Sequence, residues 1–120
     1  MLQERPVRQL HGEPRRRWFS DEDFDLFVFY EGRTIVGFQL CFDKQADETA
    51  LTWDRSEGVW IRRVDTGEAH PFEQRSPVLT EAGDVSPAEL AARFRDAATS
   101  IPDTVRDAVL RVLDGLKGER

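Results

Sequence analysis

The feature that most constrains the fold is a series of four strand-like runs separated by short loops. The runs cover residues 25–31, 34–42, 49–54 and 59–64, and they are rich in β-branched and aromatic side chains. The segments between them, GR, DKQADE and RSEG, are short. A parallel crossover needs about a dozen residues or more, so consecutive strands are expected to pair antiparallel. The sequence therefore predicts a β-meander, to which RRWF at 16–19 can add a fifth strand.

Helical periodicity begins only near residue 86. Ser86, Pro87 and Glu89 form a capping box with proline at the first helical position. Two apolar stripes at helical spacing follow, consisting of Leu90, Ala91, Phe94 and Ala97, and then of Val105, Val109, Val112, Leu113 and Leu116. The predicted fold class is therefore α+β: a four- to five-stranded antiparallel β-meander packed on two C-terminal α-helices.

Length and charge favour a single domain. The 120 residues are predicted to form a flexible basic arm at 1–14 and one α+β domain at 15–120. Five Arg and two Glu make residues 1–17 basic, whereas the whole chain carries a net charge of −6, which disfavours nucleic acid as a partner. One cysteine, no signal-peptide pattern and no apolar run of membrane-spanning length lead us to expect a cytoplasmic protein without membrane contact.

The aromatic-rich segment 23–43 is predicted to be a hairpin with two unlike faces. Gly32 in EGRT suits a type II′ turn, which would place Tyr30 opposite Ile35 and Phe27 opposite Phe38. Residues opposite one another share a face. This register predicts one uniformly large, apolar core face made of Phe27, Phe29, Val36, Phe38, Leu40 and Phe42. The other face is mixed and includes Tyr30, Gly37, Gln39 and Cys41.

The next predicted hairpin extends the mixed face. A five-residue loop, DRSEG, would pair Thr52 with Trp60, Leu51 with Ile61 and Ala50 with Arg62. Aromatic and Arg side chains dominate many binding interfaces. The predicted binding residues are therefore Tyr30, Gln39, Thr52, Trp60 and Arg62. Three occupants of this face remain open: the chain's own RRRWF segment, a second copy in a homodimer, or an unknown protein or small-molecule partner.

Catalytic and metal-binding patterns are sparse. The segment DTGEAH brings Asp65, Glu68 and His70 close in sequence, but it equally suits a tight turn, which we favour. Cys41 lies among hydrophobic residues, so we expect a packing role. The acidic run FSDEDFD lacks the glycine and the terminal glutamate of a calcium loop and is expected to be a solvated turn facing the basic arm. The sequence predicts no metal and no cofactor.

Residues 16–80 resemble a small family of uncharacterised bacterial proteins. The resemblance lies in a shared pattern of Trp-Phe, Phe-Asp-Leu, Gly-Phe-Gln-Leu-Cys and Leu-Thr-Trp. The resemblance implies a bacterial, single-domain, cytoplasmic protein and carries no established activity. The leading hypothesis is a non-enzymatic binding or protein-interaction module that uses the mixed face. The alternatives are a small enzyme with an acid/base site near Asp65, Glu68 and His70, and a homodimer-forming structural protein.

Overall fold

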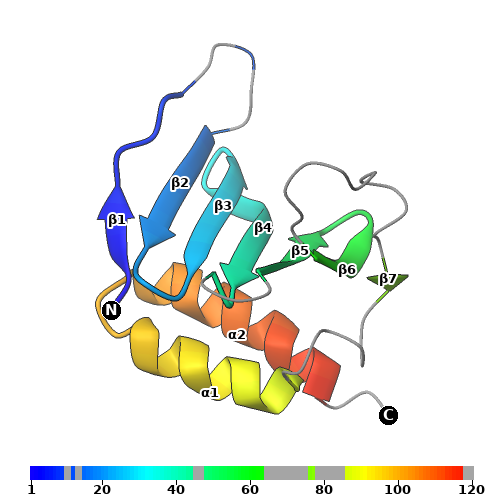
Figure 1. Cartoon of the computed structure of the whole chain (residues 1–120). Coiled ribbons are helices and arrows are strands. Elements are labelled where there is room, and N and C mark those ends of the chain that lie inside the picture. Colours follow the sequence, from blue (N-terminus) through cyan, green and yellow to red (C-terminus); the bar gives the residue numbers. More distant parts are fainter. Residues whose placement is uncertain (10–11, 13–14, 45–47, 64–75, 78–85, 118–120) are drawn as a thin grey trace.

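A computed structural model describes residues 1–9, 12, 15–44, 48–63, 76–77 and 86–117. The chain forms one antiparallel sheet followed by two helices (Figure 1). The strands are β1 (Gln3–Arg5), β2 (Arg15–Ser20), β3 (Asp25–Glu31), β4 (Thr34–Phe42), β5 (Thr49–Asp54), β6 (Gly58–Arg63) and β7 (Ser76–Pro77). The helices are α1 (Pro87–Ala97) and α2 (Asp103–Lys117).

The sheet is a meander in which every strand neighbours the next one in the chain, in the order β1 to β7. The α+β class and the antiparallel meander are therefore confirmed. Strands β3, β4 and β5 have the bounds that the sequence predicts. Short connections account for this agreement, because they leave each strand no partner but its neighbour.

The first residues of the segment 1–14, which is predicted to be a flexible arm, contact the domain. Gln3–Arg5 pair with β2 and extend the sheet at its edge. Leu2 is completely buried in the core, and its N–H donates to the Ala97 carbonyl at the end of α1, with an N–O distance of 2.8 Å. Strand pairing, a buried apolar side chain and a backbone hydrogen bond together hold the start of the chain against the domain.

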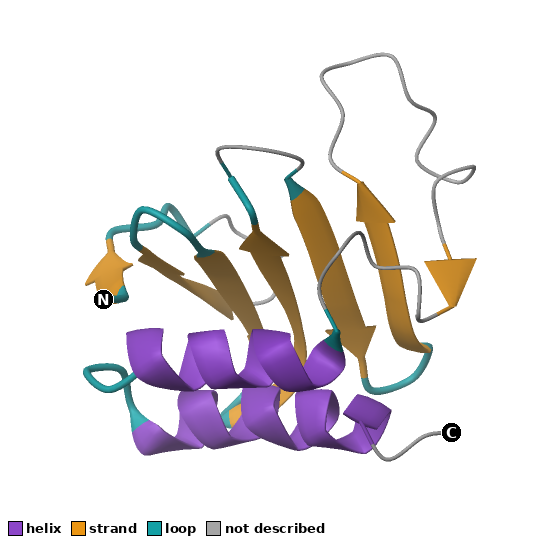
Figure 2. Ribbon diagram, turned by 60° about the horizontal axis from the view of Figure 1, so that its bottom comes forward, coloured by secondary structure: helices purple, strands orange, loops and turns teal. Residues whose placement is uncertain are grey.

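Both helices lie side by side across one face of the sheet (Figure 2). The predicted cap of α1 is confirmed, since Ser86 Oγ accepts the Glu89 N–H at 3.1 Å. Phe94 of α1 meets Phe24 edge-to-face, with ring centroids 6.0 Å apart. The core between sheet and helices includes Phe19, Leu26, Val28, Phe38, Leu40, Phe42, Leu51, Leu90, Phe94, Val105, Val109 and Leu113. No helix within the described ranges is both long and apolar enough to cross a membrane.

The register of the β3–β4 hairpin differs from the prediction because of a β-bulge. Tyr30 pairs with Ile35 as expected, but Phe29 pairs with Gly37, so Val36 is an extra residue on β4. The Val36 carbonyl instead accepts the Arg55 N–H at 3.0 Å. Beyond the bulge, β3 is shifted by one position relative to β4, which exchanges the faces of its side chains.

The prediction that Phe27 and Phe29 belong to the core is therefore wrong. Leu26 and Val28 occupy the core positions, and Phe27 and Phe29 lie half-buried on the opposite face. The predictions for Phe38 and Phe42 are confirmed, since both are fully buried. The β5–β6 hairpin has no bulge, and its predicted pairs, Thr52 with Trp60, Leu51 with Ile61 and Ala50 with Arg62, are all confirmed.

Candidate binding face of the sheet

The face of the sheet opposite the helices, here called the outer face, carries an aligned set of aromatic and polar residues. Each member is the Cα partner of the next on the neighbouring strand. Opposite residues share a face, so the set runs straight across the sheet. We call it the transverse row, and it consists of Arg5, Trp18, Phe27, Gln39, Thr52 and Trp60.

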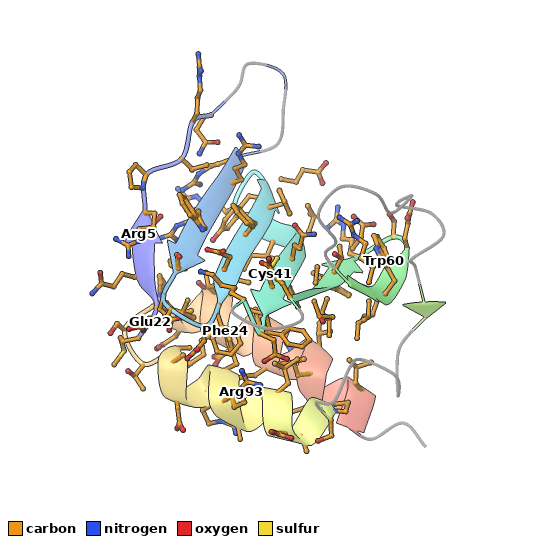
Figure 3. All side chains as sticks on the ribbon, in the orientation of Figure 1. Arg5, Glu22, Phe24, Cys41, Trp60 and Arg93 are labelled. Atoms are coloured by element: carbon orange, nitrogen blue, oxygen red, sulfur yellow. The ribbon has the colours of Figure 1, made fainter. Side chains whose placement is uncertain are left out.

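The structure brings four of the five predicted binding residues to the outer face. Gln39, Thr52 and Trp60 are consecutive in the transverse row, and Arg62 lies opposite Ala50 in the adjoining row. All four are partly exposed. The RRRWF segment belongs to β2 in the plane of the sheet, so it does not fold over them. Trp60 on β6 is labelled in Figure 3.

Tyr30, the fifth predicted residue, lies on the helix-covered side. Its side chain is only 8% exposed and belongs to the hydrophobic core. The Arg15 guanidinium carbon lies 5.1 Å from the centroid of its ring, and Arg17 donates to its hydroxyl at 3.5 Å. The bulge at Val36 explains the difference, because the predicted register assigned every β3 residue beyond the turn to the wrong face.

Three aromatic residues of the outer face were not predicted there, namely Trp18, Phe27 and Phe29. The rings of Trp18 and Phe27 stack nearly parallel, with an interplanar angle of 10° and centroids 5.8 Å apart. Trp18 Nε1 donates to Asp25 Oδ1 at 3.0 Å, which fixes the orientation of the indole ring. A sequence signal for Trp18 existed: in RRRWFS it alternates with Phe19, so one of the two had to face away from the core.

A hollow of about 490 Å³ opens on the outer face at this aromatic pair. Trp18, Phe27 and Phe29 contribute its aromatic lining. Pro6 and Val7, from the segment that leads from β1 toward β2, line it as well. Its volume is within the range of about 300–1,000 Å³ that is usual for small-molecule sites.

The segment beside the hollow is held to β2 by a compact set of hydrogen bonds. The Gln9 side-chain amide donates to the Arg16 carbonyl at 2.7 Å and accepts the Arg16 N–H at 3.1 Å. The Arg16 guanidinium donates to the Arg8 carbonyl at 2.9 Å. Arg8 and Arg16 also line the hollow, and none of the lining residues that the structure describes is a carboxylate. The lining therefore carries positive charge in a chain whose net charge is negative.

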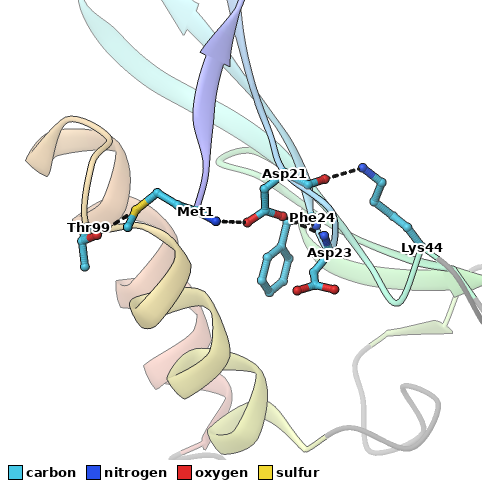
Figure 4. A network of polar contacts seen from close by, with 6 residues as sticks. All are labelled: Met1, Asp21, Asp23, Phe24, Lys44 and Thr99. Carbon is cyan, nitrogen blue, oxygen red and sulfur yellow. Dashed lines mark hydrogen bonds and ion pairs between the residues drawn. The ribbon is translucent and has the colours of Figure 1, made fainter.

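The acidic turn at 21–25 is organised differently from the solvated turn that was expected. Asp21 Oδ1 accepts the N–H groups of Asp23 and Phe24, both at 2.8 Å (Figure 4). The amino group of Met1 lies 3.1 Å from Asp21 Oδ2, and Lys44 Nζ donates to the Asp21 carbonyl at 2.8 Å. The Asp21 carboxylate and carbonyl thus contact the N-terminal amino group and a lysine rather than the arginines of residues 1–17.

The same contacts determine the acidity of Asp21. Burial by itself raises the pKa of the carboxyl group. The hydrogen bonds from the Phe24 and Asp23 N–H groups, together with the Met1 amino group, lower it further than burial raises it, so the pKa lies below its ordinary value. Asp21 therefore stabilises the turn in its ionised form.

Cys41 has the environment of a packing residue. It is buried on the outer face and, as Figure 3 shows, lies in the middle of the sheet. Burial raises the pKa of its thiol to about 12, and the nearby carboxylates of Glu48 and Asp25 add to this effect. The thiol is therefore protonated at neutral pH and is a poor nucleophile.

The predicted acid/base residues Asp65, Glu68 and His70 lie outside the described residues. Within the described ranges, no group of three or more His, Cys, Asp or Glu side chains is arranged to hold a metal ion.

Phe24 and Arg93, labelled in Figure 3, connect the turn between β2 and β3 to α1. The Arg93 guanidinium carbon lies 5.7 Å from the centroid of the Phe24 ring, and Arg93 pairs with Asp43 at 3.1 Å. This contact between layers supports the fold.

Comparison of the chain with protein-family models, with curated proteins and with solved structures found no match. The resemblance of residues 16–80 to a bacterial family therefore stays a prediction.

Proposed function

We propose that the protein is a non-enzymatic binding module that recognises its partner through the outer face of the sheet. The observation that carries this proposal is the transverse row. Trp18, Phe27 and Trp60 present partly exposed aromatic surface on three strands, with the polar side chains of Gln39 and Thr52 between them. Aromatic area beside a few hydrogen-bonding groups is the composition that gives binding sites both affinity and orientation.

The rigidity of the strands supports this proposal. On a paired strand the backbone hydrogen bonds fix each Cα relative to its neighbours, so the direction in which each side chain leaves the sheet is set before a partner binds. The row therefore needs little ordering when a partner binds, and a small ordering cost favours affinity. Gln39 adds both a donor and acceptors at the centre of the row.

The proposal is tested by a fragment screen on the ¹⁵N-labelled chain, with backbone amide shifts as the readout. We expect shifts to cluster on Phe27, Gln39, Thr52 and Trp60, and to be absent from the exposed side of α2 around Arg111. Shifts confined to the helices, or no shifts at any fragment concentration up to about 1 mM, would overturn the proposal.

Self-association through the same face is the alternative that the exposed aromatic side chains also favour. Sedimentation of the wild-type chain and of Trp60→Glu separates the two. A monomer at all concentrations supports an outer face that is available to a different partner. A dimer that Trp60→Glu dissociates would replace the proposal with a homodimer interface.

A further inference from the structure

We propose that the hollow at Trp18 and Phe27 binds a small planar aromatic anion: an aromatic ring stacked on the side chains of the outer face, with a phosphate or carboxylate group held by Arg8. The inference rests on the proposed function, because it names the ligand class for one end of the same face. Four observations support it.

The first observation is the aromatic surface. Trp18 and Phe27 are nearly parallel, and the Trp18 ring is held by its hydrogen bond to Asp25. Both rings remain partly exposed on the side that lines the hollow. Stacking on such a surface favours planar ligands, because every aromatic ring presents a π face regardless of its substituents.

The second observation is the charge. Arg8 is exposed, lines the hollow and forms no ion pair with any other residue in the described ranges. Within the described part of the chain, the carboxylate bonded to the aromatic pair is that of Asp25, which accepts from Trp18 Nε1 and pairs with Lys44 at 3.2 Å. A guanidinium with free donors beside an aromatic surface suits a phosphate or carboxylate, which it can bind through two parallel hydrogen bonds.

The third observation is preorganisation. Gln9 binds both backbone groups of Arg16, and the Arg16 guanidinium binds the Arg8 carbonyl. These bonds place the backbone of Arg8 beside the hollow before any ligand arrives. An anion site whose backbone is already positioned loses less conformational entropy on binding.

The fourth observation is size. About 490 Å³ accommodates a molecule with one or two rings and an acidic group. A long polyanion is disfavoured, because the net charge of −6 opposes binding along an extended phosphate backbone. Gln39 lines the hollow too, and its amide can bond to polar atoms at the edge of the ring.

Matched pairs of probes test the inference on the full chain. Adenosine 5′-monophosphate is compared with adenosine, and 2-naphthoate with 2-naphthamide, by titration of ¹H–¹⁵N spectra that include the Trp18 indole Nε1–H. We expect at least one anion to shift Trp18, Phe27 and Gln39 and to bind about tenfold more tightly than its uncharged counterpart. The anion with the larger preference identifies phosphate or carboxylate as the preferred group.

Arg8→Gln should abolish the preference for the anion while leaving the spectrum of the unbound protein unchanged away from residues 6–9. Arg111→Gln, which removes an exposed arginine from α2, is the matched control and should leave the preference intact. Two results would overturn the inference: equal affinity of both members of each pair, or a preference that survives Arg8→Gln. If other fragments still shift Thr52 and Trp60, the proposed function stands without it. If no compound shifts the outer face, both fail.

Discussion

The two faces of the sheet are built from the same strands, yet they leave their aromatic side chains in different environments. On the helix-covered face, Phe38 and Phe42 are fully buried. On the outer face, Trp18, Phe27 and Phe29 remain partly exposed. The difference arises from the helices, which cover only one side (Figure 2). The covered face therefore supplies most of the apolar burial, whereas the outer face keeps apolar surface available for contact.

The largest change in unfolding free energy is expected from the first of two alanine substitutions, which lie in the neighbouring strands β4 and β3. Phe38→Ala removes a fully buried ring that contacts Trp53, and should cost about 3–5 kcal/mol of unfolding free energy because a cavity remains. Phe27→Ala removes a half-buried ring and should cost about 1–2 kcal/mol. Urea denaturation followed by circular dichroism measures both. Equal losses would show that the outer face is as well packed as the core.

The second test concerns Gly37, where the bulged strand β4 closely approaches β5. A Cβ atom at this position would lie 2.9 Å from the Trp53 carbonyl oxygen, which is backbone and cannot easily move. Gly37→Ala should therefore destabilise the fold by about 1–3 kcal/mol. In Gly115→Ala, the new methyl group meets nothing within 4 Å and lies in α2, so the substitution should stabilise by about 0.5–1 kcal/mol. Melting temperatures that move in the same direction would contradict this account.

Gly37 and Val36 also show how far the sequence could predict the structure. The bounds of β3, β4 and β5, the meander and the β5–β6 register follow from local patterns and short loops, and they are confirmed. The predicted β3–β4 register is wrong because β4 contains an extra residue, Val36, whose carbonyl accepts the N–H of Arg55 in the turn that follows β5. No residue in the segment DLFVFYE predicts the hydrogen bond between Arg55 and Val36. Both of its alternating sets are apolar, so either face of β3 could have been the buried one.

The candidate site was predictable to a similar degree. Gln39, Thr52, Trp60 and Arg62 reach the outer face because β4–β5 and β5–β6 pair regularly. The hollow was not predictable, because it depends on a segment that lies far from β4 in sequence and is positioned by Gln9. Side-chain hydrogen bonds between a loop and a strand edge leave no periodic signal in a sequence.

The third test removes the carboxylate that ties the N-terminal edge of the sheet together. Asp21→Ala should cost about 1–2 kcal/mol at pH 7, because two backbone N–H groups lose a charged acceptor. The pKa of Asp21 is lower in the folded chain than its ordinary value of 3.8. The stabilisation is therefore complete above the unfolded pKa and is lost as the pH falls through the folded one.

The difference in unfolding free energy between the wild type and Asp21→Ala, measured by urea denaturation, should therefore become smaller as the pH falls below about 4. Asp23→Ala is the control, since its side chain is exposed and its contribution to the turn is its backbone N–H. If the loss of unfolding free energy in Asp21→Ala were the same from pH 7 to pH 3, the ionised carboxylate would not be what stabilises the turn.

The smallest expected effect is at the margin of the helix-covered side, where β1 and β2 carry an ion pair. Glu4 accepts two hydrogen bonds from the Arg17 guanidinium, at 2.6 and 2.9 Å, and these bonds lower the pKa of Glu4. Since Glu4 is exposed and Arg17 is partly exposed, Glu4→Gln should cost no more than about 0.5–1 kcal/mol, and the loss should shrink in 1 M NaCl. Glu31→Gln breaks a more exposed pair with Arg55 and should cost less still. A loss above about 2 kcal/mol for Glu4→Gln would mean that β1 is held by this pair more than by Leu2, and that the covered face depends on charge at its edge as well as on apolar burial.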